Sequence, residues 1–258
     1  MKLCEANQKL SEEVKGFLQN VPDVKEESIT DYLVWKWGEL DDKFNYINIK
    51  TFTRKEENLI TGADFEIELW IVGRTFHFPL VFQAKKAVKP FDSYASKLNY
   101  PKNTQAQLKK LLSYSLSKRR LPFYVFYSIP DSDTQVMCAM NQAQGSGVFM
   151  MDAFTAKEFA DGRRGYRISK NKILAATNPF HCMFCCPLIC DGEYFNHYFG
   201  RIAEYLGTVV DQDIPNYVSL LLSGQWREMG REEALTVVRK NELEVYRFVG
   251  VYDMRDRD

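Results

Sequence analysis

The spacing of hydrophobic residues predicts one helix and three strands in the first third of the chain. Apolar residues recur every three or four positions over 26–40, which is the spacing of a helix that buries one face. The period then changes to two over 46–52 and again over 63–72, as in half-buried strands. A Gly-Arg turn signal follows and 75–87 continues as a strand, so the second and third strands should form an antiparallel hairpin.

Beyond the hairpin, the pattern predicts a second helix and a buried strand. Three leucines at helical spacing indicate a helix over 104–117. The run LPFYVFYSI over 121–129 is continuously apolar and ends at a proline, which is typical of a strand covered on both faces. Later elements have weaker patterns: we expect strands at 147–152 and 242–251 and helices at 155–160 and 194–206.

The order helix, three strands, helix, strand predicts an α/β fold. No segment rich in Gly, Pro or Ser is convincing as a linker, so we expect a single domain over 1–258. Its core should cover about 25–130, and an α+β elaboration should cover about 131–258.

Composition excludes several classes of protein. The chain has 258 residues, of which 45% are hydrophobic, with 34 Lys+Arg against 34 Asp+Glu. Such proportions are ordinary for a globular protein and leave ample apolar surface to bury. No apolar run approaches the roughly 20 residues that span a membrane. The first residues lack the apolar region of a signal peptide, so we expect no membrane association and a cytoplasmic location.

The zero net charge hides an uneven distribution. From Lys85 to Arg120 the chain carries ten basic residues and one acid, with tyrosines interleaved among them. A local basic face with aromatics is typical of proteins that bind a phosphate backbone, although a solvated helix face gives a similar pattern. Six lysines of this stretch are the candidate nucleic-acid contacts: Lys86, Lys89, Lys97, Lys102, Lys109 and Lys110.

The predicted hairpin carries the residues with the clearest chemistry. Period two places Asp64, Glu66 and Glu68 on one face of the first hairpin strand, and Gln83 and Lys85 on one face of the next. Carboxylate and amide oxygens are ligands that Mg²⁺ prefers, and Mn²⁺ accepts the same set. An adjacent lysine can orient an attacking water or stabilise charge that develops on a phosphate. For Glu68 we favour a simpler interpretation, the solvent face of a half-buried strand.

These residues also resemble a known pattern. Asp64 followed by Gln83-x-Lys85 resembles the motif of the restriction-endonuclease-like PD-(D/E)xK nuclease superfamily. Together with EESITDYL, TGADFE and QAK, it is similar to a family of uncharacterised bacterial members of that superfamily. The resemblance covers about 25–130 and implies a central mixed sheet flanked by helices. No proline precedes Asp64 and Gln83 is neutral, and both are departures from the usual motif.

The resemblance implies a role for each matching residue. Asp64 would bind the metal, with the side chain of Gln83 in place of the usual second acid. The backbone carbonyl of Ala84 would be a further ligand, and Lys85 would be the catalytic lysine.

The missing second carboxylate has several candidates in the sequence. The resemblance implies Glu27 from the first core helix, which would join the catalytic and metal-binding set, or Glu66 from the strand. Glu26 is an alternative to Glu27, because spacing alone does not decide which of the two faces the sheet.

The function implied is a Mg²⁺-dependent or Mn²⁺-dependent endonuclease that hydrolyses phosphodiester bonds, most naturally of double-stranded DNA. Such enzymes act in restriction and antiviral (anti-phage) defence and often form a homodimer to cut both strands. The alternative is a non-catalytic nucleic-acid-binding or assembly module that retains a nuclease-like core. Metal-dependent cleavage distinguishes the two.

Four of the six cysteines lie within 182–190. Cys182-x-x-Cys185 has the spacing of a zinc knuckle, so a Zn²⁺ site is one interpretation. Without a secretion signal, reduced thiols are expected rather than a disulfide framework. Because the segment is otherwise apolar and unpaired cysteine is often buried, we favour a core strand that uses thiols.

Overall fold

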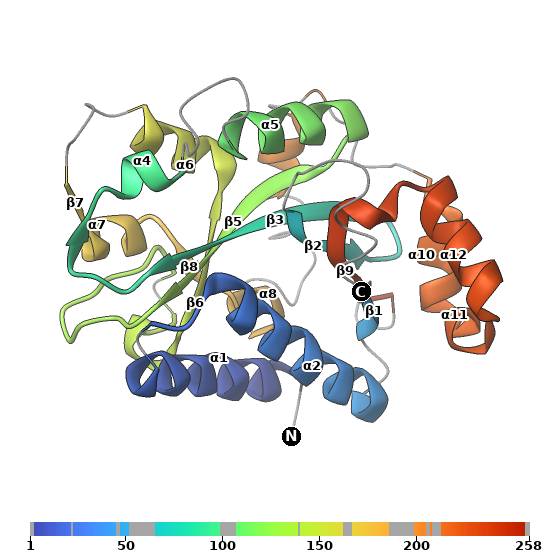
Figure 1. The fold of residues 1–258 in the computed structure, drawn as a ribbon, viewed down its shortest axis with the longest axis horizontal. Coiled ribbons are helices and arrows are strands. Elements are labelled where there is room, and N and C mark those ends of the chain that lie inside the picture. The colour runs from blue at the N-terminus through green and yellow to red at the C-terminus, as the bar shows by residue number, and fades with distance from the viewer. Residues whose placement is uncertain are drawn as a thin grey trace.

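The computed structural model describes residues 3–21, 23–44, 47–51, 65–98, 107–138, 140–161, 167–185, 199–204, 207 and 213–255. A seven-stranded mixed sheet runs through the molecule, with helices on both faces (Figure 1). The predicted α/β class with a mixed central sheet is therefore confirmed. Among the described residues, no helix is long and apolar enough to cross a membrane.

The sheet has the strand order β1-β9-β2-β3-β5-β6-β8. The pairs β2–β3, β5–β6, β6–β8 and β1–β9 are antiparallel, whereas β3–β5 and β2–β9 are parallel. The strands are β1 (Ile47–Thr51), β2 (Phe65–Val72), β3 (His77–Ala87), β5 (Leu121–Ser128), β6 (Val148–Asp152), β8 (Asn178–Pro179) and β9 (Tyr246–Asp253). A small second sheet pairs β4 (Phe91–Asp92) with β7 (Ile168–Ser169).

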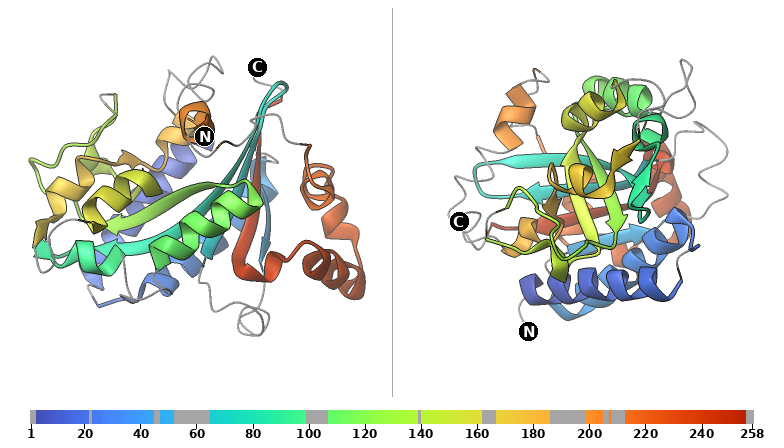
Figure 2. Two further views of the ribbon diagram at one scale, coloured as in Figure 1. Left: turned by 90° about the horizontal axis from the view of Figure 1, so that it is seen from above. Right: turned by 90° about the vertical axis from the view of Figure 1, so that its left-hand side faces the viewer.

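Two layers of helices bury the faces of the sheet (Figure 2). One face is covered by α1 (Leu3–Asn20), α2 (Glu26–Phe44) and the single turn α8 (Cys182–Cys185). The other is covered by α4 (Tyr94–Leu98), α5 (Gln107–Lys118), α6 (Ala153–Ala160), α7 (Lys170–Leu174), α10 (Asn216–Leu222), α11 (Gln225–Glu228) and α12 (Arg231–Lys240). Short 3₁₀ turns occupy Ala143–Gly145 and Leu243–Val245.

The hydrophobic pattern explains why the strands lie between these layers. In β2, Ile67 and Leu69 pack on the α1–α2 side, while Trp70 and Val72 pack on the α5–α10 side. Every residue of β5 is buried, which is the cause of the continuously apolar run over 121–129. The predicted α2, hairpin strands, α5 and β5 are all present, with ends shifted by a few residues.

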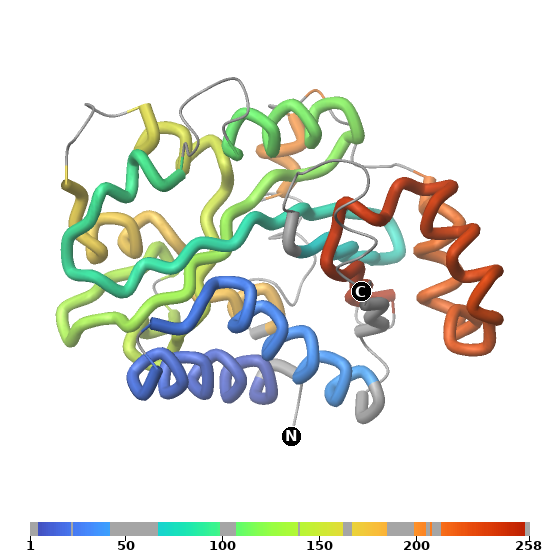
Figure 3. The backbone as a smooth tube through the Cα atoms, in the orientation of Figure 1, coloured from blue at the N-terminus to red at the C-terminus, as the bar shows by residue number. Residues whose placement is uncertain are grey.

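The C-terminal half is part of the central sheet and not an appendage beside it. The strand expected at 242–251 is β9, and it lies between β1 and β2. Figure 3 allows the chain to be followed from α1 and α2 at the blue end to the red C-terminal segment, which returns to the sheet. Residues 248–252 of β9 (FVGVY) are apolar and buried on both faces, as expected for a strand between two helical layers.

The cysteine segment corrects a prediction. We expected a core strand over 182–190, but Cys182–Cys185 forms a helical turn, and 186–190 lie outside the described residues. Met183 and Phe184 are both buried in the core beneath α1 and α2. A short apolar run fits a buried turn as well as a buried strand, so periodicity could not separate them. Of the helix expected at 194–206, residues 199–204 are described and are helical.

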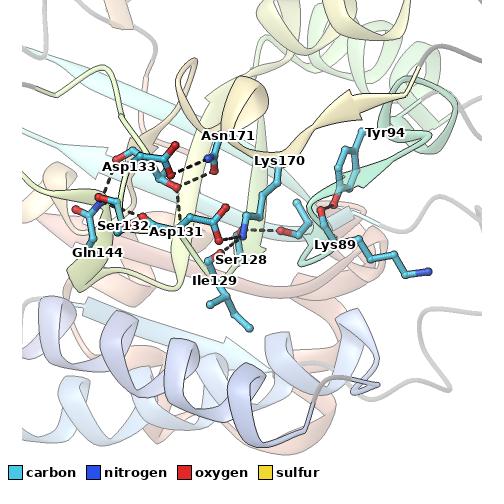
Figure 4. Close-up of polar contacts among 12 residues, drawn as sticks. Lys89, Tyr94, Ser128, Ile129, Asp131, Ser132, Asp133, Gln144, Lys170 and Asn171 are labelled. Carbon is cyan, nitrogen blue, oxygen red and sulfur yellow. Dashed lines mark hydrogen bonds and ion pairs between the residues drawn. The ribbon is translucent and has the colours of Figure 1, made fainter.

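A polar clamp holds the chain where it leaves the carboxyl end of β5 (Figure 4). The ammonium of Lys170 donates to the carbonyl of Ile129 and, at 2.8 Å, to Oδ1 of Asp131. The side-chain amide of Gln144 donates to three backbone carbonyls of the same loop, those of residues 131, 132 and 134. Beside this clamp, the hydroxyl of Ser128 donates to the last carbonyl of β3. The loop is therefore fixed by the buried Lys170 and the half-buried Gln144, which both come later in the chain.

Replacing Lys170 with methionine should destabilise the protein by about 2 kcal/mol, because it leaves the Ile129 carbonyl without this donor and Asp131 without its cation. The Lys170 side chain is only 4% exposed, so water cannot easily take its place. Urea denaturation measures the free energy of unfolding, with Lys172→Met, an exposed lysine of the same helix, as the control. Equal stability of the two variants would contradict the role of the clamp.

Candidate active site

The antiparallel pairing of β2 and β3 determines where the candidate residues meet. Ile67 pairs with Phe82, so the beginning of β2 lies beside the end of β3. Gln83 and Lys85 follow Phe82 in β3 and alternate with it, which places both on the α5–α10 side of the sheet. The prediction that they share a face is confirmed. Gln83 is buried and Lys85 is half-buried.

The acids predicted at the start of β2 are not all described. Asp64 lies outside the described residues, immediately before Phe65, the first residue of β2. Glu66 belongs to β2, but its side chain is outside the described part. Within the described part of the chain, no three His, Cys, Asp or Glu side chains gather closely enough to hold a metal ion.

Lys85 has a partner that the sequence did not suggest. Its ammonium donates a 2.6 Å hydrogen bond to Oε1 of Gln107. Gln107 is the first residue of α5, the helix that covers this face of the sheet. This contact limits the directions in which the lysine can point. The only signal for it in the sequence is a polar residue near the beginning of the helix predicted over 104–117.

An acid from α2 also lies near Lys85, and it is Glu26. Glu26 is half-buried at the first position of α2, and its carboxylate accepts a hydrogen bond from the backbone N–H of Lys86. Burial raises the pKa of Glu26, and the positive charges of Lys85 and Lys97 only partly oppose this effect. Glu27, the residue first implied for this role, is exposed. A rotation of about 100° per residue separates the two neighbours.

The raised pKa of Glu26 is relevant to whether a divalent cation would fit beside Glu26 and Gln83. Burial disfavours the carboxylate more than the two nearby lysines favour it. A divalent cation would supply the missing positive charge, and the Gln83 amide oxygen is a further hard ligand of the kind Mg²⁺ prefers. Glu26 and Gln83 therefore suit a Mg²⁺ or Mn²⁺ ion by their donor chemistry.

The stability of the wild-type protein should fall, relative to that of Glu26→Gln, as pH rises. The folded state holds the Glu26 proton more tightly than the unfolded state, whose glutamates titrate near about 4.3. Below the unfolded-state pKa, protonated Glu26 makes its full contribution to the stability of the fold. This contribution is lost as pH rises through the higher folded-state pKa. Urea denaturation at acidic and neutral pH measures the difference in the free energy of unfolding between Glu26→Gln and wild type, with Glu27→Gln as the matched control. If this difference does not increase toward neutral pH, the burial of the Glu26 carboxyl is contradicted.

Fewer lysines of the basic stretch are available at the surface than the sequence suggests, because some of them form hydrogen bonds or ion pairs within the protein. Lys86 donates to the carbonyl of Val24 at 2.7 Å. Lys97 forms a 2.6 Å ion pair with Asp92 but keeps about half of its side chain exposed. Lys89 and Lys109 are exposed, Lys110 is half-buried, and Lys102 lies outside the described residues. Among the six candidate lysines, the exposed ones that the structure describes are therefore Lys89, Lys97 and Lys109.

Glu68 corrects another expectation. We expected it on a solvent-facing surface, but its side chain is fully buried. Oε1 accepts a 2.6 Å hydrogen bond from Nε of Arg120, and Oε2 accepts one of 2.9 Å from the hydroxyl of Tyr217. The guanidinium of Arg120 also lies over the ring of Trp70, at 4.9 Å from its centroid. Because α10 covers this face of β2, a carboxylate there must be paired.

This buried network joins the C-terminal region to the strand that carries the candidate acids. Tyr217 belongs to α10, and its hydroxyl also accepts a hydrogen bond from the Trp70 indole at 3.2 Å. Burial and the negative charge of Glu68 raise the pKa of Tyr217, so the phenol stays neutral and donates. The second half of the chain thus fixes β2 in place.

The candidate zinc site is only partly covered by the described residues. The thiol of Cys182 contacts the amide of Asn141 and the thiol of Cys138, and the side chain of Cys185 lies outside the described part. Burial lowers the pKa of the neighbouring His181 to about 4, so its ring is neutral. The Cys182 thiol is therefore in contact with a second cysteine that is distant in the sequence.

Comparison with known proteins identifies a family but no characterised relative. A family model described as a family of unknown function matches residues 3–244. No curated protein and no solved structure matches the chain. The match spans both halves of the sequence, in agreement with one sheet built from both.

Proposed function

The chain belongs to the family of unknown function DUF6615, and we propose that it is a metal-dependent endonuclease that hydrolyses phosphodiester bonds of DNA. One observation carries the proposal. Glu26 from α2 lies near Lys85 of β3, at the end of β3 that adjoins the start of β2. The resemblance of Asp64 and Gln83-x-Lys85 to the PD-(D/E)xK motif adds the nuclease chemistry. The restriction-endonuclease-like character of the core is part of the same proposal.

The residues have distinct roles in this proposal. Asp64 and Gln83 would hold a Mg²⁺ or Mn²⁺ ion, with Glu26 as the acid from the helix and Glu66 as a further ligand. A bound divalent ion supplies charge stabilisation to a phosphate and lowers the pKa of a water that it binds. The ammonium of Lys85 orients a water and stabilises the negative charge that develops on the phosphate. Gln107 is a positioning residue, because its side-chain oxygen fixes the direction of that ammonium.

Nucleic acid would approach along the exposed part of the basic stretch. Lys97 is close enough to Glu26 to influence its charge, so a phosphate contact and the site would be neighbours. Lys89 and Lys109 would add contacts to the backbone without reading sequence. Binding should therefore weaken as salt concentration rises, since each phosphate contact releases counterions.

Incubation with supercoiled plasmid tests the proposal. We expect nicked or linear product in Mg²⁺ or Mn²⁺ and none in EDTA. Direct appearance of linear product would indicate two sites acting together, as in a homodimer. Binding of DNA without cleavage in any divalent metal would favour the non-catalytic module instead. A role in restriction or anti-phage defence rests on the resemblance and would require cleavage of foreign DNA.

A further inference from the structure

Two cysteines that are distant in the sequence lie side by side away from the β2–β3 site. Cys138 is in the loop between β5 and β6, and Cys182 begins α8. The amide nitrogen of Asn141 is 3.5 Å from the sulfur of Cys138 and 3.2 Å from the sulfur of Cys182. The thiol of Cys182 also donates a hydrogen bond to the sulfur of Cys138, and neither forms a disulfide. We propose that these two thiols are a redox site that forms a reversible disulfide on exposure to a peroxide.

The surroundings of Cys138 favour its reactive form. Burial opposes the thiolate, but the backbone N–H groups of Met140 and Asn141 and the Asn141 side chain all donate to this sulfur. Together with the Cys182 thiol they hold the pKa of Cys138 below its ordinary value. The thiolate is the form that attacks an oxidant, so Cys138 is better prepared to react than an ordinary buried cysteine.

Access to solvent differs between the two cysteines and sets their order of reaction. Cys138 is partly exposed, and its neighbours Met137 and Met140 are 59% and 63% exposed. Cys182 is only 5% exposed. A peroxide can therefore reach Cys138 first, because Cys182 is buried. This is the arrangement of a reactive and a resolving cysteine.

The reaction balances with a peroxide as the oxidant. The Cys138 thiolate attacks one peroxide oxygen, the O–O bond breaks, and hydroxide (for an organic peroxide, alkoxide) leaves and takes up a proton. Cys138 is then a sulfenic acid. The Cys182 sulfur attacks the sulfur of Cys138, an S–S bond forms, and the S–O bond breaks with release of water. Each sulfur loses one electron, and the peroxide gains two.

The backbone already holds the two segments together. The N–H of Met137 donates a 2.8 Å hydrogen bond to the carbonyl of Thr177, which immediately precedes β8. The loop of Cys138 is therefore fixed against the segment that leads to Cys182 before any oxidation. A disulfide would need only a local approach of two sulfur atoms that are already in hydrogen-bond contact.

Mass spectrometry of the full chain after treatment with hydrogen peroxide tests this proposal. We expect a cross-linked peptide pair that contains Cys138 and Cys182, two hydrogens lighter than the separate peptides and released by dithiothreitol. In Cys182→Ser, the sulfenic acid of Cys138 should persist and be trapped by dimedone. A bond from Cys182 to Cys185, or protection of Cys182 by bound Zn²⁺, would overturn the proposal. The readout is independent of nuclease activity.

A rate measurement tests the role of the shared amide. Asn141→Ala should form the cross-link about three to ten times more slowly, because the thiolate loses a donor. Gln142→Ala, an exposed neighbour, is the matched control and should react at the wild-type rate. Equal rates for the two variants would overturn the proposed activation by Asn141.

Discussion

Lys85→Ala should lower the rate constant of Mg²⁺-dependent DNA cleavage by about a thousandfold. The ammonium is held by Gln107 at the end of β3, near the Glu26 carboxylate, so alanine removes a cation that is fixed close to a proposed metal ligand. Positioned groups of this kind contribute typically about 10² to 10⁴ in rate. Single-turnover cleavage measures the loss without interference from DNA release.

Two further variants show whether the loss of rate in Lys85→Ala comes from the proposed active site. Gln107→Ala should cost less than Lys85→Ala, because the ammonium remains but loses its orientation. Lys109→Ala removes an exposed lysine of the same basic stretch and should weaken DNA binding while leaving the single-turnover rate at saturation unchanged. If Lys85→Ala cleaves as fast as Lys109→Ala, Lys85 has no catalytic role.

The choice between the two acids of α2 is tested in the same assay. Glu26→Gln should raise the Mg²⁺ concentration needed for half-maximal cleavage, because Glu26 is the acid near Lys85. Glu27→Gln changes an exposed neighbour and should leave that concentration near the wild-type value. The reverse order of effects would restore Glu27 as the helix acid.

Arg120→Met should destabilise the fold by about 3–5 kcal/mol, because it leaves the buried Glu68 carboxylate without its cation. Glu68 has no exposed surface, so water does not replace the guanidinium. The matched control is Lys118→Met, which breaks the exposed ion pair with Glu242 and should cost less than about 1 kcal/mol. Urea denaturation measures both.

A double variant separates the ion pair from simple packing. Glu68→Met combined with Arg120→Met removes both charges, so it should be more stable than Arg120→Met alone. A double variant that is as unstable as the sum of the two single variants would indicate that the charges do not interact. A loss in Arg120→Met no greater than that in Lys118→Met would contradict the burial of this network.

The spacing of apolar residues predicted the helices and strands well, because it reflects which faces of each element are covered in the fold. α2 has a helical apolar stripe because one of its faces covers the sheet, and β5 is apolar throughout because both of its faces are covered. The common face of Gln83 and Lys85 follows from the period of two in a strand. These features depend on residues close together in the sequence.

Features set by distant contacts could not be predicted in this way. β9 lies between β1 and β2, although it follows them by most of the chain. Glu68 is buried because α10 covers it, and nothing near Glu68 in the sequence indicates that cover. Glu26 and Glu27 differ only in how α2 is rotated against the sheet, and Gln107 reaches Lys85 from the start of another helix.

The most direct test of the proposed active site is plasmid cleavage by wild type and Asp64→Ala in Mg²⁺. Asp64 precedes β2 and is the acid that the motif makes indispensable. The control is Asp23→Ala, an exposed acid just before α2. We predict that wild type and Asp23→Ala nick the plasmid, that EDTA stops both, and that Asp64→Ala leaves it supercoiled. Equal cleavage by Asp64→Ala and wild type, or no cleavage by any of the three, would contradict the nuclease site.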